Sequence, residues 1–575
     1  MRRLTRFLKG YYKQLILGPT FKLIEAIFEL IVPLVMVRMI DIGVAGRDAS
    51  YVWRLGGVLV LLGVVGLMCA LVCQYSASVA SQGVGTALRA ALYRKINTLS
   101  FAELDRFGAP SLVTRITNDV NQLQFAVAML IRLVIRAPFL AIGAMIMAFS
   151  IDATLSLVFL ATLPLIAFVL YRIMSRSVPH FRVMQQKLDR VALITRENLS
   201  GARPVRAFSM EPRETARFSA ASEDVADTGV RVGRLSALLN PLTYCIANLG
   251  IVAILWVSGF RVQAGALTAG EVIALVNYMT QILLALVVVA NLVVTFTKAS
   301  ASAARVNEIF DTQPSVTEPE HPQPAPGGAC AIAFHAVDFR YPGGEQDTLN
   351  ALDFSIMTGE TIGIIGGTGS GKSTLAALIA RFYDTSRGSV SVLGQDVRAW
   401  SLAALRRTVS MVPQDCTLIS GTIAENLRWN KEDASEAELL AALSTAQALE
   451  FVNHMPDGIY SRVEASGRNL SGGQRQRLTI ARALVGAPPI LILDDAASAL
   501  DLATDAALRR ALRRDVQGAT VLMISQRIST VAGADRILVL DDGRIAGFDT
   551  HAALLKSCPL YREIALSQGF EEVAQ

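Results

Sequence analysis

The sequence predicts a chain of two unlike parts, an α-helical six-span transmembrane domain followed by an α/β domain. Three observations lead to this fold class. The chain has 575 residues, which is too long for a single domain. Hydrophobic residues make up 52% of it and charged residues only 18%, and this composition is too apolar for a soluble globular protein. From about Ala329 onward, short β-branched runs alternate with helical patterns, as in an α/β domain.

Apolar runs of about 20 residues mark the candidate membrane spans. We expect each of them to be a helix, because a lone strand cannot satisfy its backbone hydrogen bonds in lipid. The six runs lie near residues 16–40, 53–77, 129–149, 153–172, 237–260 and 271–297.

The connections between the spans predict the topology. Three of them (43–52, 150–152 and 261–270) are short and nearly free of basic residues, whereas segments 78–128 and 173–236 are long and rich in arginine. Positive charge favours the cytoplasmic side, so we place the N-terminus, both long segments and the C-terminal part in the cytoplasm. We expect the long segments to extend the helices and to turn near 107–117 and 198–208. The net charge of +6 then reflects topology and predicts no nucleic-acid partner.

Charged residues inside the spans are the exceptions to this apolar pattern. Lys22, Glu25 and Glu29 share one face of the first span, and Arg132 and Arg136 lie one turn apart on the third. Charges at membrane depth face a bundle interior or a cavity and are usually paired. Two interpretations stay open: a translocation cavity in which Glu25 and Glu29 meet a cationic substrate, or interhelical ion pairs such as Glu29 with Arg132.

The Pro-rich segment after the sixth span predicts the domain boundary. We assign residues 1–312 to the transmembrane domain, 313–328 to a semi-rigid linker and 329–575 to the α/β domain.

A phosphate-binding loop is the strongest motif in the α/β part. The strand Thr361–Ile365 runs into the pattern G-x-x-x-x-G-K-S, which is followed by an apolar helix. In this arrangement backbone N–H groups and the helix N-terminus cradle phosphates, the lysine reaches the β- and γ-phosphates, and the serine hydroxyl takes a Mg²⁺ position. The predicted loop residues are Gly366, Gly367, Thr368, Gly369, Ser370, Gly371, Lys372, Ser373 and Thr374.

Four further features accompany the loop. Asp494 ends the strand 490–493 and can hold Mg²⁺, while Gln414 follows the strand 409–412 and can reach the metal or the attacking water. Leu470–Gln474, with the sequence LSGGQ, opens the helix 475–485 as a second phosphate-facing surface. Tyr341 follows the strand 331–340 and can stack on a base. Each feature alone fits an ordinary structural role, but together they indicate a nucleotide site.

With LSGGQ, residues 329–570 resemble the ATP-binding cassette of ABC transporters, and the first 310 residues look like the six-helix membrane domain of ABC exporters. The resemblance implies a half-transporter that works as a dimer and uses ATP and Mg²⁺. It also implies that Tyr341 stacks on adenine, that Gln414 is the Q-loop residue and that Asp494 is the Walker B aspartate. The residues that would contact ATP held by the partner cassette are Ser471, Gly472, Gly473, Gln474 and Asp501.

Two positions depart from the family pattern. Asp495 stands where the family has a catalytic glutamate, and Gln526 where it has a switch histidine. An aspartate is one methylene shorter as a general base, and a glutamine cannot carry a positive charge. We expect slow hydrolysis with intact ATP binding. The departures resemble the degenerate-site subunit of heterodimeric bacterial multidrug exporters.

The sequence therefore predicts an ATP-driven exporter of hydrophobic or amphipathic small molecules in a bacterial plasma membrane, with a second half-transporter, lipid and substrate as partners. A siderophore or peptide transporter on the same fold, a homodimeric exporter and a non-transporting ATP-sensing subunit are the alternatives. The six spans argue against the last of these.

Overall fold

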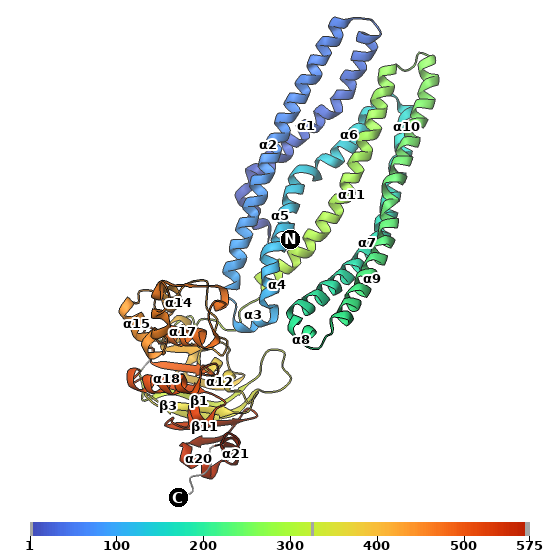
Figure 1. Ribbon diagram of the computed structural model, residues 1–575. Coiled ribbons are helices and arrows are strands. Elements are labelled where there is room, and N and C mark those ends of the chain that lie inside the picture. Colours follow the sequence, from blue (N-terminus) through green and yellow to red (C-terminus); the bar gives the residue numbers. More distant parts are fainter. Residues whose placement is uncertain (1–3, 324–326, 570–575) are drawn as a thin grey trace. The chain divides into compact units, whose positions relative to one another are not determined.

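The chain forms two compact units in the computed structural model, which describes residues 4–323 and 327–569 (Figure 1). The first unit comprises Met1–Ile96 and Pro110–Asp311, and the second comprises Asn97–Ala109 and Thr312–Gln575. Residues 324–326 of the predicted linker and the ends of both predicted domains, 1–3 and 570–575, lie outside the described residues.

The first unit is entirely helical in its described part, as its apolar composition predicts. Most of its length is in long helices, and short π-helical turns interrupt the first and third predicted spans. The elements are η1 (Leu4–Tyr11), α1 (Tyr12–Arg38), η2 (Met39–Val44), α2 (Ala49–Ile96), α4 (Ala109–Thr114), η3 (Arg115–Asp119), α5 (Val120–Met129), η4 (Leu130–Val134), α6 (Arg136–Ile151), α7 (Ala153–Ser200), α8 (Ala202–Ala207), α9 (Glu211–Ala237), α10 (Leu239–Gln263) and α11 (Ala269–Asp311).

Five helical segments of the described chain are long and apolar enough to cross a membrane. They are Ala49–Ile96, Ala109–Ile151, Ala153–Ser200, Glu211–Gln263 and Ala269–Asp311, and each contains one of the predicted spans 2 to 6. The first predicted span corresponds to α1, a helix of 27 residues that carries Lys22, Glu25 and Glu29. Because of these charges, α1 is not among the five apolar segments, so its crossing of the membrane stays a prediction.

Of the two turns predicted at the ends of the long helices, one lies where the sequence predicts it. The second turn lies at α8, between the end of α7 at Ser200 and the start of α9 at Glu211, as predicted. The first was predicted near 107–117, but the chain leaves α2 at Ile96 and turns before α3 (Phe101–Phe107). The prediction was wrong because Ser100 and Glu103 form a capping box that starts a new helix at Phe101.

The second unit contains two larger sheets and the helices that pack on them. Its strands are β1 (Cys330–Phe339), β2 (Leu349–Met357), β3 (Thr361–Gly366), β4 (Arg387–Val392), β5 (Gln395–Asp396), β6 (Val409–Val412), β7 (Gly421–Thr422), β8 (Arg462–Val463), β9 (Ile490–Asp494), β10 (Thr520–Ile524), β11 (Arg536–Asp541) and β12 (Arg544–Asp549).

Helices of the second unit are shorter than those of the first. They are α3, α12 (Lys372–Ile379), η5 (Val397–Ala399), α13 (Leu402–Thr408), α14 (Ile423–Leu427), α15 (Glu436–Thr445), α16 (Leu449–Asn453), η6 (Gly458–Tyr460), η7 (Ala465–Gly467), α17 (Gly472–Leu484), α18 (Leu502–Asp515), α19 (Ile528–Val531), α20 (His551–Ser557) and α21 (Pro559–Ser567).

The main sheet has six strands in the order β12-β11-β3-β10-β9-β6. All neighbouring pairs are parallel except β11 with β12. The carboxyl ends of β3, β9 and β10 therefore lie at one edge, where ligands bind in open α/β sheets. A four-stranded antiparallel sheet, β2-β1-β4-β5, shares a hydrophobic core with β3 and α12.

Residues 97–109 and 312–323, which the sequence assigned to the membrane domain and the linker, pack within the second unit. Phe101 of α3 stacks on Phe382 with ring centroids 4.4 Å apart, and the Tyr383 hydroxyl donates to Asp105 at 2.7 Å. Burial and this hydrogen bond raise the pKa of Tyr383. The described part of the predicted linker is held as well, since Val316 N–H donates to the Ser100 hydroxyl at 3.0 Å. The segment is therefore anchored by backbone hydrogen bonds.

Candidate functional site

The glycine loop between β3 and α12 has the backbone that a phosphate cradle requires. Gly369 and Gly371 have φ values of +84° and +95°, a region that side chains rarely adopt. A Cβ on Gly371 would also lie 2.5 Å from the Leu349 side chain. Any other residue at these two positions would change the path of the loop, and with it the directions of the backbone N–H groups.

Lys372, the first residue of α12, folds its side chain back into this loop. Its ammonium donates to the carbonyl oxygens of Gly366 at 3.0 Å and Gly367 at 2.6 Å. Burial lowers the pKa of Lys372, while the carboxylates of Asp494 and Asp495 act in the opposite direction. The loop thus holds a buried cation beside two acids, a charge arrangement suited to an anionic ligand with a bound cation.

Asp494 and Ser373 meet across the carboxyl edge of the sheet. The Ser373 hydroxyl donates to an Asp494 carboxylate oxygen at 3.1 Å. Asp494 is buried at the end of β9, and this burial raises its pKa despite the hydrogen bond from Ser373. The hydroxyl and the carboxylate, with the Gln414 amide on the same cavity, form the all-oxygen donor set that Mg²⁺ prefers.

A cavity of about 330 Å³ joins most of the predicted cassette residues, and we call it the loop cavity. Residues from five of the predicted stretches line it. These are Tyr341, the loop residues Thr368, Gly369 and 371–374, Gln414, the neighbours Asp494 and Asp495, and Gln526. Gly366, Gly367 and Ser370 belong to the loop without lining the cavity. Sequence reasoning missed Thr348, Ile524 and Ser525, which also line it. The end of β10, the strand next to β3, was the signal available for the last two.

Tyr341 stands at the rim of the loop cavity. Its hydroxyl shares a hydrogen bond of 3.0 Å with the Thr374 hydroxyl. The rings of Phe339 and Tyr383 meet it edge to face, with centroids 4.9 and 5.3 Å away. Because 37% of the residue remains exposed, the ring is held in place and still open to solvent, as a stacking platform for a base requires. Tyr383, which fixes this ring, was missed by the sequence analysis.

Asp495 follows Asp494 in a left-handed backbone conformation, with φ of +48°. Its N–H donates to the Ile524 carbonyl at 3.0 Å, and its carbonyl accepts from Gln476 at 3.1 Å. Aspartate tolerates this conformation better than most residues. Burial raises the pKa of the Asp495 carboxyl, and the charges of Arg527 and Lys372 lower it.

Gln526 lines the loop cavity from the segment between β10 and α19. A residue near the C-terminus, Gln568, brackets this segment: its amide donates to the Gln526 carbonyl at 2.7 Å and accepts from the Ile528 N–H at 2.8 Å. Gln568 follows α21, whose Tyr561 and Ala565 pack in one core with Ile528 and Val531. The sequence carried no sign of this contact.

The LSGGQ segment does not line the loop cavity. Ser471 caps α17, and its side chain forms a reciprocal capping box with Gln474. Gly472 and Gly473 open the helix, and a Cβ on Gly473 would lie 3.2 Å from the Ala499 carbonyl. Asp501 likewise caps α18 by accepting from the Thr504 N–H at 2.8 Å. The contacts of these residues with ATP held by a partner cassette stay a prediction.

In the first unit, the two acidic residues of the first span are both engaged. Lys22 donates to both oxygens of Glu25 at 2.7 Å, and Arg136 pairs with Glu29 at 2.7 Å. The interhelical pair predicted for Glu29 thus exists, but the predicted partner Arg132 was wrong: the π-helical turn η4 shifts the register of the third span, and Arg136 reaches Glu29 instead. Contact of Glu25 or Glu29 with a cationic substrate stays a prediction.

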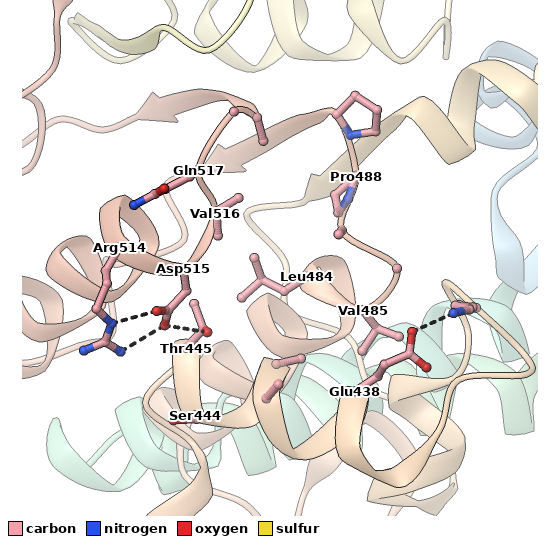
Figure 2. A pocket seen from close by; sticks show the side chains of 18 residues that line it. Glu438, Ser444, Thr445, Leu484, Val485, Pro488, Arg514, Asp515, Val516 and Gln517 are labelled. Carbon is pink, nitrogen blue, oxygen red and sulfur yellow. Dashed lines mark hydrogen bonds and ion pairs between the residues drawn. The ribbon is translucent and has the colours of Figure 1, made fainter.

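A separate hollow of about 890 Å³ lies between α15, the end of α17 and the end of α18 (Figure 2). Its charged side chains pair with neighbours: Glu438 with Lys431 at 2.6 Å and Asp515 with Arg514 at 2.7 Å (Figure 2). None of the predicted site residues lines it. The loop cavity is therefore the candidate functional site.

Comparison with known proteins places the whole chain among characterised folds. A family model described as "ABC transporter transmembrane region" matches residues 15–286, and one described as "ABC transporter" matches residues 349–498. A solved bacterial Atm1-family ABC exporter with ATP bound is similar at 26% identity and a TM-score of 0.80, over 99% of both chains.

Curated relatives include an uncharacterised ABC transporter ATP-binding protein of Mycobacterium tuberculosis, 38% identical over 98% of each chain. An ATP-dependent lipid A-core flippase of Chromobacterium violaceum is 31% identical over 100% of this chain and 98% of its own. A multidrug efflux ATP-binding/permease protein of M. tuberculosis is 31% identical over 98% of this chain, which spans 47% of that longer protein.

Proposed function

The chain belongs to the ABC transporter family, and from that premise we propose that it is one half of an exporter of amphipathic small molecules, with the loop cavity as its ATP site. The observation that carries the ATP site is the convergence of residues from five stretches on one cavity with a buried lysine. The family's exporters are membrane-bound ATPases that work as pairs of such halves, which matches a helical membrane domain joined to a cassette.

Within that site, the chain's own residues divide the work. Tyr341 would offer its ring to the adenine, Lys372 would turn from its loop carbonyls to the phosphates, and Ser373, Asp494 and Gln414 would hold Mg²⁺. The ion would neutralise charge on the phosphates. Asp495 and Gln526 line the same cavity and would act on the γ-phosphate. The LSGGQ serine and glycines and Asp501 complete the corresponding site on the partner cassette.

We assign this cassette to the less active of two sites. Asp495 has a shorter reach than the family glutamate, and its φ of +48° fixes the backbone from which it extends. Gln526 can donate to a γ-phosphate but carries no charge. Both differences reduce transition-state stabilisation without removing ATP contacts, so the partner's site, completed by this chain's LSGGQ, does most of the hydrolysis.

The relatives support an amphipathic substrate in a bacterial plasma membrane. One is named a lipid A-core flippase, a name that describes a lipid substrate, and another a multidrug efflux protein. On ATP binding, two cassettes would close on each other and change the side to which the membrane domain opens. Residues 97–109 pack within the cassette unit, so they would move with it and carry the adjoining ends of α2 and α4.

The test compares the full-length chain purified alone with the chain co-expressed with the half-transporter encoded by a neighbouring gene. We expect a one-to-one complex with brisk ATPase activity and a nearly inactive chain alone. A homodimer with brisk ATPase activity would show that Asp495 is a competent base and would replace the asymmetric assignment with a homodimeric exporter. Transport that survives Lys372→Ala together with the equivalent partner variant would contradict ATP-driven export.

A further inference from the structure

Five charged side chains form a group within the first and third spans, which we call the intramembrane charge cluster: Lys22, Glu25, Glu29, Arg132 and Arg136. They come from α1, η4 and the first residue of α6. Arg136 reaches Glu29 of α1 by an ion pair at 2.7 Å, and Ile131, the residue before Arg132, packs with the buried Cys73 of α2 in one hydrophobic core. The charges therefore share one region inside the helices.

The cluster has one positive charge too many. Lys22 and Glu25 neutralise each other, with side chains that are 17% and 19% exposed, and Arg136 and Glu29 form a second pair. Arg132 is left over: it is half-buried, and no described residue forms an ion pair or hydrogen bond with it. An unpaired guanidinium at membrane depth is costly and an anion would stabilise it, but the described part of this chain supplies none.

The backbone around Arg132 has a specific distortion. Pro138 lacks an N–H, so the carbonyl of Val134 has no donor four residues ahead, and the chain forms the π-helical turn Leu130–Val134. Such turns are rare and are frequent at functional sites. Around this turn Arg136 reaches Glu29 of α1, and Ile131 packs against Cys73 of α2.

Hydrogen-bonding capacity also remains unused at the cluster. The Arg136 Nε and the Gln281 Oε1 atoms are buried without a partner among the described residues. Gln281 lies on α11 and donates to the Glu29 carbonyl at 3.3 Å. Arg132 and Arg136 thus offer cationic donors, and Gln281 offers a neighbouring acceptor. The oxygens of an acidic group can accept from the arginines and an adjacent hydroxyl can donate to Gln281, whereas a cation can accept from none of the donors.

We propose that the intramembrane charge cluster binds the anionic group of the transported amphiphile, a carboxylate or phosphate, with Arg132 as its principal partner. The inference rests on the proposed function and reverses the charge expected from Glu25 and Glu29 in the sequence. The same chemistry could recognise a free amphiphile or an anionic lipid headgroup.

The test uses the full-length transporter in phosphatidylcholine nanodiscs and three C12 amphiphiles below their micellar concentrations: dodecyl phosphate, dodecanol and dodecyltrimethylammonium. ATPase stimulation is recorded as a function of concentration. We expect dodecyl phosphate to act at the lowest concentration. Arg132→Gln should raise its half-maximal concentration about tenfold, as loss of a charge-assisted hydrogen bond does, and leave dodecanol unchanged. For Arg132→Lys, the half-maximal concentration of dodecyl phosphate should lie between that of the unsubstituted chain and that of Arg132→Gln.

The control is Arg38→Gln, which removes an exposed arginine at the end of α1 and should change none of the three curves. Discs that contain phosphatidylglycerol separate the two sources of the anion. Competition of this lipid with dodecyl phosphate assigns the site to lipid headgroups, and its absence assigns the site to the free amphiphile. Either result supports the anion site.

Two results overturn the inference while leaving the proposed export function intact. One is stimulation by dodecyltrimethylammonium at lower concentrations than dodecyl phosphate. The other is an unchanged dodecyl phosphate curve in Arg132→Gln, which would mean that a carboxylate of the second subunit neutralises Arg132. If the basal ATPase is normal and none of the amphiphiles changes it, both the amphipathic substrate class and the anion site are wrong.

Discussion

The loop cavity and the intramembrane charge cluster both hold cations next to acids, yet they are built in opposite ways. In the loop cavity, main-chain carbonyls bind the Lys372 ammonium, and the backbone pairing of the sheet positions Asp494 at the end of β9. In the cluster, side chains alone make the pairs: Lys22 with Glu25 within α1, and Arg136 with Glu29 between two helices that share no backbone ladder. The first arrangement is set by short motifs and a strand order, whereas the second depends on helix register, which a single π-helical turn can change.

The largest effect should come from the cation of the loop cavity. We expect Lys372→Ala to weaken ATP binding to the purified full-length chain about 100-fold, because it removes a buried charge from the phosphates. A fluorescent ATP analogue measures the change, and Lys556→Ala, at an exposed position on α20, is the control. An unchanged affinity would mean that backbone donors alone hold the nucleotide, and the contrast with the cluster would disappear.

A gain of function sharpens the assignment of the catalytic positions. Asp495→Glu combined with Gln526→His should raise the ATPase rate of the transporter by roughly ten- to a hundredfold, since the base gains reach and the switch position gains a charge. The matched control is Asp542→Glu, an exposed aspartate whose φ of +45° resembles that of Asp495. If the double variant is no faster, these two positions do not limit the rate.

For the cluster, the expected effect is on stability. Glu29→Gln leaves Arg136 without its counter-ion and should lower the free energy of unfolding by roughly 1–3 kcal/mol, a range reduced for its partial exposure. Adding Arg136→Gln should recover part of this loss, since the uncompensated charge is then gone. Thermal unfolding in one detergent measures the double-mutant cycle. Strict additivity of the two changes would show that the pair is not coupled.

The smallest effect concerns Gln568. Gln568→Met keeps the side chain's size but loses both hydrogen bonds to the Gln526 segment, so the preference for AMP-PNP over ADP should fall about threefold. ADP lacks the γ-phosphate, and its affinity should not change. Ser567→Ala, on the preceding exposed residue, is the control. The same substitution can be made in a Gln526→Ala background. If Gln568→Met lowers the preference for AMP-PNP over ADP there by the same factor, Gln568 does not act through the Gln526 side chain.

The sequence predicted best what the main chain determines locally. The strand before the loop, the strand 409–412 and five of the six spans follow from composition and periodicity, and the loop spacing placed Lys372 and Ser373 beside Asp494. It failed where side chains from distant segments choose partners. Glu29 pairs with Arg136 because of a π-helical turn, and Gln568 reaches Gln526 because α21 packs beside α19. The first register has only Pro138 as a local sequence signal, and the second has none.

The packing of α3 also affects how the cassette behaves when it is expressed alone. A fragment starting at Thr312 would lack Phe101 and Asp105, leaving the Phe382 ring without its stacking partner and the Tyr383 hydroxyl without its acceptor. Tyr383 in turn supports the ring of Tyr341 at the loop cavity. Such a fragment would present uncovered aromatic surface to solvent and a looser base platform, so its solubility and nucleotide affinity would understate those of the intact chain.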